Sequence, residues 1–146
     1  MKTPEIQVGV GDYGYGNDIR MGIVAYRDQF TNWNLRKTGA LLRPFPSGGL
    51  DGALVAIQNE DLEKRWLQTS VPVVNVSSSL KDLTFPSVLV DNIYVGELAA
   101  DHFLERQFEN FAYVGPENNL HSVQREQGFR MKVENREGAF FRYRSE

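Results

Sequence analysis

The spacing of apolar side chains alternates between two periods along the chain. Near the start, Ile6, Val8 and Val10 alternate with a polar residue or a glycine, and this two-residue period predicts a strand. A glycine-rich turn over residues 11–16 follows. Apolar residues then recur at every third or fourth position over residues 19–30, which predicts a helix of about three turns.

The remaining elements follow from the same two periods. Strands are expected at 33–36, 52–57, 71–76, 86–90, 111–114 and 140–143, and helices at 59–69, 91–103 and 121–137. The helix from Asp91 is expected to carry an apolar stripe of Val95, Leu98, Ala99, His102 and Phe103. Residues 37–50 show no clear helical period. Because strands alternate with helices, we expect an α/β fold with a Rossmann-like, mostly parallel sheet flanked by helices on both faces.

The charges are spread evenly over the 146 residues. Residues 1–90 hold nine basic and nine acidic side chains, and residues 91–146 hold seven and ten. Neither part has the basic excess that binding to phosphates needs. We therefore do not expect this chain by itself to bind DNA.

Several chemistries are excluded by the residue types. The chain has no cysteine, so it can form neither disulfides nor thiolate metal sites. Its two histidines, His102 and His121, are isolated in the sequence, and we expect no metal site and interpret His102 as a structural residue. No signal peptide and no run of transmembrane length is found, so we expect no membrane and a cytoplasmic location.

The glycine-rich turn has the spacing of a dinucleotide-binding fingerprint. Gly9, Gly11 and Gly14 match it and lie between a predicted strand and a predicted helix. However, Asp12 would face the phosphates, and residues 41–44 contain no acid to bind a ribose. We interpret the glycines mainly as residues that let the turn bend, and a nucleotide-dependent enzyme stays an alternative.

A second set of residues suits a polyhydroxylated ligand. In open parallel sheets, ligands bind at the carboxyl ends of the strands. The polar and aromatic side chains expected there are Asp12, Tyr13, Tyr15, Ser77, Ser78, Asp91 and Arg125. A carboxylate accepts hydrogen bonds from sugar hydroxyls, a guanidinium donates two at once, and an aromatic face covers the apolar side of a sugar ring.

Each of these residues also has a structural explanation. Asp91 can be a helix N-cap, with or without a role in binding. Arg125 can be a solvated charge on a helix, the two tyrosines can be ordinary turn residues, and Ser77 can belong to a polar loop. The pattern alone leaves both interpretations open.

An ordered set of short motifs covers nearly the whole chain. It comprises Gly22-Ile23, Asp51-Gly52-Ala-Leu-Val55, Val71-Pro72-Val-Val74, Val90-Asp91-Asn92 with Gly96, Ala99-Ala100-Asp-His-Phe-Leu104, Phe111-Ala-Tyr-Val-Gly115 and Ser122-x-x-Arg125-x-x-Gly128-Phe129. The set resembles the effector-binding domain of lactose-repressor-like regulators, and most of all the xylose-operon regulators. The resemblance implies the type I periplasmic-binding-protein fold, in which two Rossmann-like lobes close on a ligand.

The resemblance also implies an organisation and a function. Residues 1–90 would form lobe one and residues 91–146 a partial lobe two. A sugar, with xylose or a similar pentose as the leading candidate, would bind between the lobes and control an attached DNA-binding module, without catalysis or a cofactor. The implied contact positions are Tyr15, Asp91 and Arg125, with Tyr13 as a polar position and Ser77 where ribose-binding relatives have an aspartate.

The family pattern extends beyond Glu146. We therefore expect the rest of lobe two and the DNA-binding module to be absent from this chain, so that DNA is a partner only through that module. The edge left open is expected to be covered by self-association, as a homodimer. A solute-binding protein for sugar transport is the main alternative function.

Overall fold

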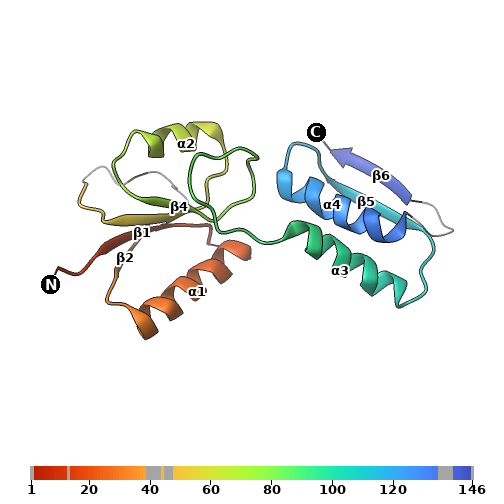
Figure 1. The fold of residues 1–146 in the computed structure, drawn as a ribbon, viewed down its shortest axis with the longest axis horizontal. Coiled ribbons are helices and arrows are strands. Elements are labelled where there is room, and N and C mark those ends of the chain that lie inside the picture. The colour runs from red at the N-terminus through yellow and green to blue at the C-terminus, as the bar shows by residue number, and fades with distance from the viewer. Residues whose placement is uncertain (1, 13, 39–43, 45–47, 135–139, 146) are drawn as a thin grey trace. The chain divides into compact units, whose positions relative to one another are not determined.

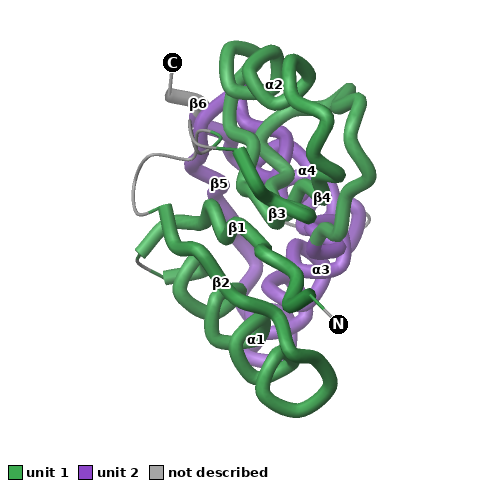
Figure 2. Tube along the Cα trace, turned by 90° about the vertical axis from the view of Figure 1, so that its left-hand side faces the viewer, with its two compact units in different colours: residues 1–89 green, residues 90–146 purple. Residues whose placement is uncertain are grey.

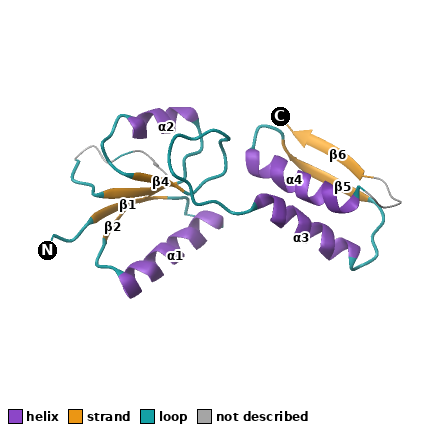
Figure 3. Cartoon of the chain, in the orientation of Figure 1, coloured by secondary structure: helices purple, strands orange, loops and turns teal. Residues whose placement is uncertain are grey.

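The protein forms two compact units. The computed structural model describes residues 2–12, 14–38, 44, 48–134 and 140–145. Unit 1 comprises residues 1–89 and unit 2 residues 90–146 (Figure 2), whereas the sequence placed the boundary after residue 90. Each unit has its own parallel sheet and its own helices (Figure 3).

Unit 1 is built on a four-stranded parallel sheet in the order β2-β1-β3-β4. Its strands are β1 (Glu5–Gly9), β2 (Asn34–Lys37), β3 (Gly52–Val55) and β4 (Val73–Asn75). Two helices, α1 (Tyr15–Phe30) and α2 (Glu60–Leu67), lie on opposite sides of this sheet (Figure 1). This arrangement agrees with the predicted parallel sheet with helices on both faces.

Each helix of unit 1 packs on a separate core. From α2, Leu62 and the fully buried Trp66 pack against β3 and β4. From α1, the partly buried Ile19 and Ile23 pack against β1. The helix α2 is capped by Asn59, whose side chain accepts a hydrogen bond from the Leu62 amide at 2.9 Å.

Unit 2 contains two helices and a two-stranded parallel sheet. Its elements are α3 (Asn92–Leu104), β5 (Phe111–Pro116), α4 (Leu120–Val133) and β6 (Phe140–Ser145). The core is formed by Ala100, Phe111, Phe129 and Val133, with Leu104 and Phe140 at its border. The sequence predicted all four elements, although the predicted end of α4 at 135–137 lies outside the described residues.

Two glycines allow the helices of unit 2 to approach very closely. A Cβ atom on Gly96 of α3 would lie 2.1 Å from the carbonyl oxygen of Arg125 on α4. A Cβ atom on Gly128 of α4 would lie 1.9 Å from the carbonyl oxygen of Ile93. Neither distance is possible for a real side chain, so only glycine fits at either position.

The predicted buried stripe of α3 is wrong. Leu98, Ala99 and His102 are exposed, while the fully buried residues of the helix are Asn92, Gly96 and Ala100. The helix carries apolar residues around most of its circumference, so their spacing does not select one face. The close contact at Gly96 selects it instead, because only the face with the smallest residues can approach α4.

The strand predicted over 86–90 is also wrong. Only one isolated parallel bridge, between Asn75 and Ser87, is formed there. Beyond it Val88, Leu89 and Val90 are exposed, which fits no buried strand. Of residues 37–50, positions 39–43 and 45–47 lie outside the described residues, so the expected absence of a helix there is not tested. Among the described residues, no helix is long and apolar enough to cross a membrane.

Candidate ligand-binding edges

The residues that follow the strands of unit 1 gather at one edge of its sheet. The strand β1 lies between β2 and β3, so the chain changes direction along the sheet next to β1. In open α/β sheets, ligands bind at the carboxyl edge beside such a reversal. In unit 1 this edge carries the turn after β1 and the segment after β4.

The turn after β1 is held by an ion-pair cluster. Oδ1 of Asp12 lies 2.6 Å from Nη1 of Arg20 and 2.9 Å from Nζ of Lys37. The hydrogen bond from the Lys37 ammonium, followed by that of Arg20, lowers the pKa of Asp12. The carboxylate therefore ties α1 and β2 to the turn.

The two tyrosines singled out in the sequence, Tyr13 and Tyr15, belong to the same turn. Tyr15 is the first residue of α1, and 53% of its surface is exposed. Tyr13 lies outside the described residues. A Cβ atom on Gly16 would lie 2.6 Å from the carbonyl oxygen of Gly11, so the turn closes tightly on itself. Tyr15 is thus an accessible aromatic residue on a well-held turn.

The segment after β4, which includes Ser77, is held in place by the fully buried side chain of Asn75. Oδ1 of Asn75 accepts hydrogen bonds from the amides of Ile57 (3.1 Å) and Ser77 (3.0 Å). Its Nδ2 donates to the carbonyl of Ser77 (2.7 Å) and to Oγ of Ser87 (3.1 Å). One side chain thereby holds the ends of β3 and β4 and the start of the following loop.

Ser77 itself is buried and hydrogen-bonded within the loop. Its Oγ lies 2.9 Å from Oγ of Ser79, and the Ser79 amide donates to the same oxygen at 3.3 Å. A ligand at this position would have to share the hydroxyl of Ser77 with Ser79. The polar-loop interpretation therefore describes the observed contacts of Ser77.

The candidate residues of unit 2 form one connected group. Asp91 is the N-cap of α3, with its side chain accepting from the Tyr94 amide at 2.9 Å. The next residue, Asn92, is only 2% exposed and accepts a hydrogen bond from Nε of Arg125 on α4 at 2.9 Å. Asn92 thus joins the capping carboxylate of one helix to the guanidinium of the other.

The start of α4 is anchored to β5. The hydroxyl of Tyr113 donates to the carbonyl of Ser122 at 2.7 Å, and a Cβ atom on Gly115 would lie 2.3 Å from Oγ of Ser122. Next to Ser122, burial of the ring and the nearby charge of Arg125 lower the pKa of His121. A cation and a histidine favoured in its neutral form therefore lie near each other at the first turns of α4.

The sequence missed the two asparagines that organise these groups. Asn75 interrupts an otherwise apolar strand, which is the signal that could have found it. Asn92 follows Asp91 directly, but its partner is 33 positions away in the sequence. In the described part of the chain, no group of three or more His, Cys, Asp or Glu could hold a metal ion.

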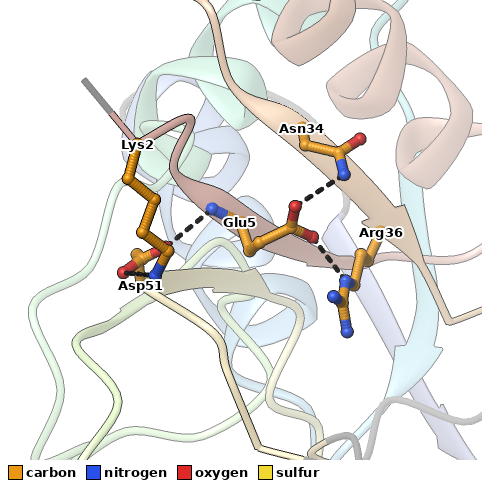
Figure 4. Close-up of polar contacts among 5 residues, drawn as sticks. All are labelled: Lys2, Glu5, Asn34, Arg36 and Asp51. Atoms are coloured by element: carbon orange, nitrogen blue, oxygen red, sulfur yellow. Dashed lines mark hydrogen bonds and ion pairs between the residues drawn. The ribbon is translucent and has the colours of Figure 1, made fainter.

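The amino edge of the unit 1 sheet carries a different cluster (Figure 4). Glu5 accepts hydrogen bonds from Nδ2 of Asn34 (2.7 Å) and Nε of Arg36 (2.5 Å). Asp51 accepts from the Glu5 amide (2.9 Å) and from Nζ of Lys2 (3.0 Å). These contacts hold the amino ends of β1, β2 and β3 together, so we interpret the cluster as structural.

Comparison with known proteins finds similarity only in structure. No family model matches the sequence, and no curated protein matches it. The structure of a xylose-binding transcription activator, XylR, superposes on 99% of this chain with a TM-score of 0.82 and 19% identity, over 39% of the XylR chain.

Two further solved structures are similar. The transcription regulator CcpA of Lactococcus lactis matches 97% of this chain with a TM-score of 0.76 and 18% identity, over 59% of its own length. A substrate-binding protein of a sugar ABC transport system from Bordetella parapertussis matches 99% with a TM-score of 0.75 and 17% identity, over 53% of its length.

These matches define the class of fold. The chain has the type I periplasmic-binding-protein-like fold shared by effector domains of transcription regulators and by solute-binding proteins, which confirms the fold expected from the sequence motifs. It spans about two fifths to three fifths of the length of the three matched chains.

Proposed function

We propose that this chain is the ligand-sensing part of a bacterial transcription regulator and that its ligand is a sugar. The observation that supports the proposal is the hydrogen bond from Nε of Arg125 to Asn92, the residue that follows the capping carboxylate of Asp91. Neighbouring hydroxyls of a sugar can donate to the carboxylate and accept from the guanidinium.

Asp91 and Arg125 each use only part of their side-chain hydrogen-bonding groups within the described residues. In the described residues, the side chain of Arg125 donates one hydrogen bond, through Nε, and the side chain of Asp91 accepts one, through Oδ1, from a backbone amide. The Nη groups of Arg125 and Oδ2 of Asp91 are therefore the atoms we assign to the sugar. Tyr13, Tyr15 and Ser77 are proposed as further contact positions, with Tyr15 covering the apolar side of the ring.

The names of the matched proteins favour a sugar. XylR binds xylose, and the Bordetella protein belongs to a sugar transport system. We propose xylose or a similar pentose as the effector, and binding without chemical conversion of the ligand. DNA would be contacted by another module of the regulator, and the regulator would work in the cytoplasm. Sugar binding would act by shifting the population between two states of the regulator.

Sugar transport is the second candidate function. The Bordetella solute-binding protein matches this chain with a TM-score of 0.75, close to the 0.76 of CcpA. Both functions require sugar binding through the same residues. They differ in the partner that responds to the bound sugar.

A homodimer is the proposed assembly, with its interface at α1 of unit 1 and not at the open edge of lobe two that the sequence suggested. The helix α1 has no fully buried residue, and Tyr26 and Phe30 on it are 50% and 67% exposed. Tyr26 contacts both Phe30 and Trp33, with ring centroids 5.1 Å and 5.6 Å apart. We propose that a second copy of this chain covers this aromatic cluster, because a two-fold axis would place two identical apolar patches together.

Calorimetric titration with D-xylose, D-ribose and D-glucose tests the proposed function. We expect one of the pentoses to bind, and Arg125→Ala to weaken binding about tenfold or more, because hydrogen bonds from a charged donor are lost. The matched control is Arg130→Ala, which removes an exposed arginine of the same helix that pairs with Glu134. Loss of binding in both variants, or in neither, would contradict the assigned site.

A further inference from the structure

We propose that Asn92 is the positioning residue for Arg125, holding its guanidinium so that the two Nη groups are available to the ligand. The inference rests on the proposed function for the identity of the ligand. The contact between the two residues is independent of that function. Asn92 follows the capping residue of α3, and Arg125 lies on the second turn of α4.

Burial makes the amide of Asn92 a fixed acceptor. The residue is 2% exposed, so water has little access to its side chain. Its Nδ2 donates to the carbonyl of Val90 at 3.2 Å, which directs Oδ1 the other way, to Nε of Arg125 at 2.9 Å. The amide thus has one orientation, set by the chain immediately before α3.

The backbone of Arg125 is placed by the same helix. Gly96 lies one turn after Asn92, and a Cβ atom there would lie 2.1 Å from the carbonyl oxygen of Arg125. The helix α3 therefore holds Arg125 at two points. Gly96 packs against the carbonyl oxygen of Arg125, and Asn92 accepts the hydrogen bond from Nε of Arg125. An exposed arginine without such contacts would sample many rotamers and lose that freedom on binding.

Because Nε of Arg125 is bonded to Asn92, the two Nη groups are the donors that remain for a ligand. A guanidinium is planar, so fixing Nε also fixes the plane in which both Nη groups lie. No other hydrogen bond of the Arg125 side chain is found in the described part of the chain. Two donors in a fixed plane suit two neighbouring hydroxyls better than a freely moving cation does.

The imidazole of His121 reports the position of Arg125 without any ligand. The Arg125 charge contributes to the lowered pKa of His121, after the effect of burial. We would measure this pKa by proton NMR of the full chain carrying His102→Gln, which leaves one histidine. Asn92→Ala should raise the pKa of His121, because the released guanidinium spends less time near the ring. Arg125→Gln should raise it as well.

The double variant separates positioning from a merely structural effect. If Asn92 acts through Arg125, Asn92→Ala should cause no further rise of the pKa of His121 when Arg125→Gln is already present. An equal rise in both backgrounds, or no rise in either, would overturn the proposal. The same cycle applies to D-xylose: Asn92→Ala should weaken binding about tenfold with Arg125 present and not with Gln at that position.

A measurement on the unchanged protein covers the case in which Asn92→Ala does not fold. The Nε–H of Arg125 should exchange with water more slowly than that of the exposed Arg106, whose Nε makes no hydrogen bond among the described residues. Equal exchange rates would contradict the held guanidinium. If D-xylose does not bind while the NMR results hold, the proposed function fails and the positioning of Arg125 stands.

Discussion

At the scale of single residues, buried amides organise both candidate edges. Asn75 makes four side-chain hydrogen bonds and is fully buried. These bonds extend the pairing of β3 with β4 past the ends of the two strands and add a contact to Ser87, which is otherwise joined to β4 only by a single bridge. Removal of the Asn75 side chain would leave amides of Ile57 and Ser77 without that acceptor, and an unpaired buried amide is costly.

We therefore predict that Asn75→Ala destabilises unit 1 by about 3 kcal/mol or more. The free energy of unfolding would be measured with urea, following the fluorescence of Trp33 and Trp66. Asn32→Ala is the matched control, because Asn32 is exposed, and its effect should stay within about 0.5 kcal/mol. Similar effects of the two substitutions would show that the network around Asn75 contributes little.

The carboxylates at the amino edge predict a dependence of stability on pH. Hydrogen bonds from Asn34 and Arg36 lower the pKa of Glu5 from its ordinary 4.5. The Glu5 amide and the Lys2 ammonium lower the pKa of Asp51 from 3.8. Because both values are lower in the folded chain, the unfolded chain binds more protons in this range. The stabilisation is present above the ordinary values and is lost as the pH falls through the folded ones.

We predict that Asp51→Asn lowers the urea midpoint at about pH 7 and lowers it much less at about pH 3. At the lower pH the Asp51 carboxylate of the parent protein contributes less stabilisation, so its replacement by asparagine removes less. Asp82→Asn is the control, since Asp82 is exposed in a loop. A constant difference between Asp51→Asn and the parent at both pH values would contradict the account.

Single residues also show where the sequence was informative. A capping role was one of the two interpretations left open for Asp91 by its position before an apolar helix, and the structure shows that role. The partners of Asp12 could not be predicted, because Lys37 reaches it only after β2 pairs with β1. The ligand contacts at Tyr13, Tyr15, Ser77, Asp91 and Arg125 stay predictions.

At the scale of elements, α3 and α4 pack through glycines and not through a stripe of large side chains. The sequence predicted both helices from their periods but selected the wrong face of α3, since periodicity ranks faces by hydrophobicity. The observed contact depends on shape, because Gly96 and Gly128 each lie against the backbone of the other helix. A pair of glycines on two predicted helices could have suggested such a crossing.

We predict that Gly96→Ala and Gly128→Ala each destabilise unit 2 by about 3 kcal/mol, since the added methyl group would force the helices apart. Gly22→Ala is the matched control within a helix. No atom lies within 4 Å of a Cβ placed at Gly22, so alanine should stabilise α1 by about 0.5–1 kcal/mol. Unfolding followed by circular dichroism would measure both effects. Stabilisation at all three positions would disprove the close crossing.

At the scale of the whole molecule, alternation of strands and helices was sufficient to predict a parallel α/β architecture, and the resemblance of the ordered motifs implied the type I periplasmic-binding-protein fold. Within unit 1, the strand β3 was found because a buried parallel strand is a continuous apolar run, as at 52–57, and β1 was found from its two-residue alternation. The two compact units divide between Leu89 and Val90, and the segment just before this point was taken for a strand. An apolar run such as 86–90 does not reveal by itself whether a partner strand is available.

The proposed homodimer predicts that the chain sediments as a concentration-dependent dimer. Phe30→Asp should shift the equilibrium strongly to the monomer, because it places a charge in the aromatic cluster of Tyr26, Phe30 and Trp33. The control Met131→Asp changes another exposed apolar residue, 54% exposed, on α4. A monomer over a wide concentration range would contradict the dimer, and a dimer unaffected by Phe30→Asp would contradict its location.

The central claim is that a sugar binds at the carboxyl edges of these sheets. It is tested most directly by amide NMR spectra of the full chain during titration with D-xylose up to about 50 mM, which detects even a millimolar dissociation constant. The account predicts saturable changes at Tyr15, Ser77, Asp91 and Arg125, and none at Glu5 or Asp51 on the amino edge. Spectra that stay unchanged, or that change only away from the carboxyl edges, would contradict it.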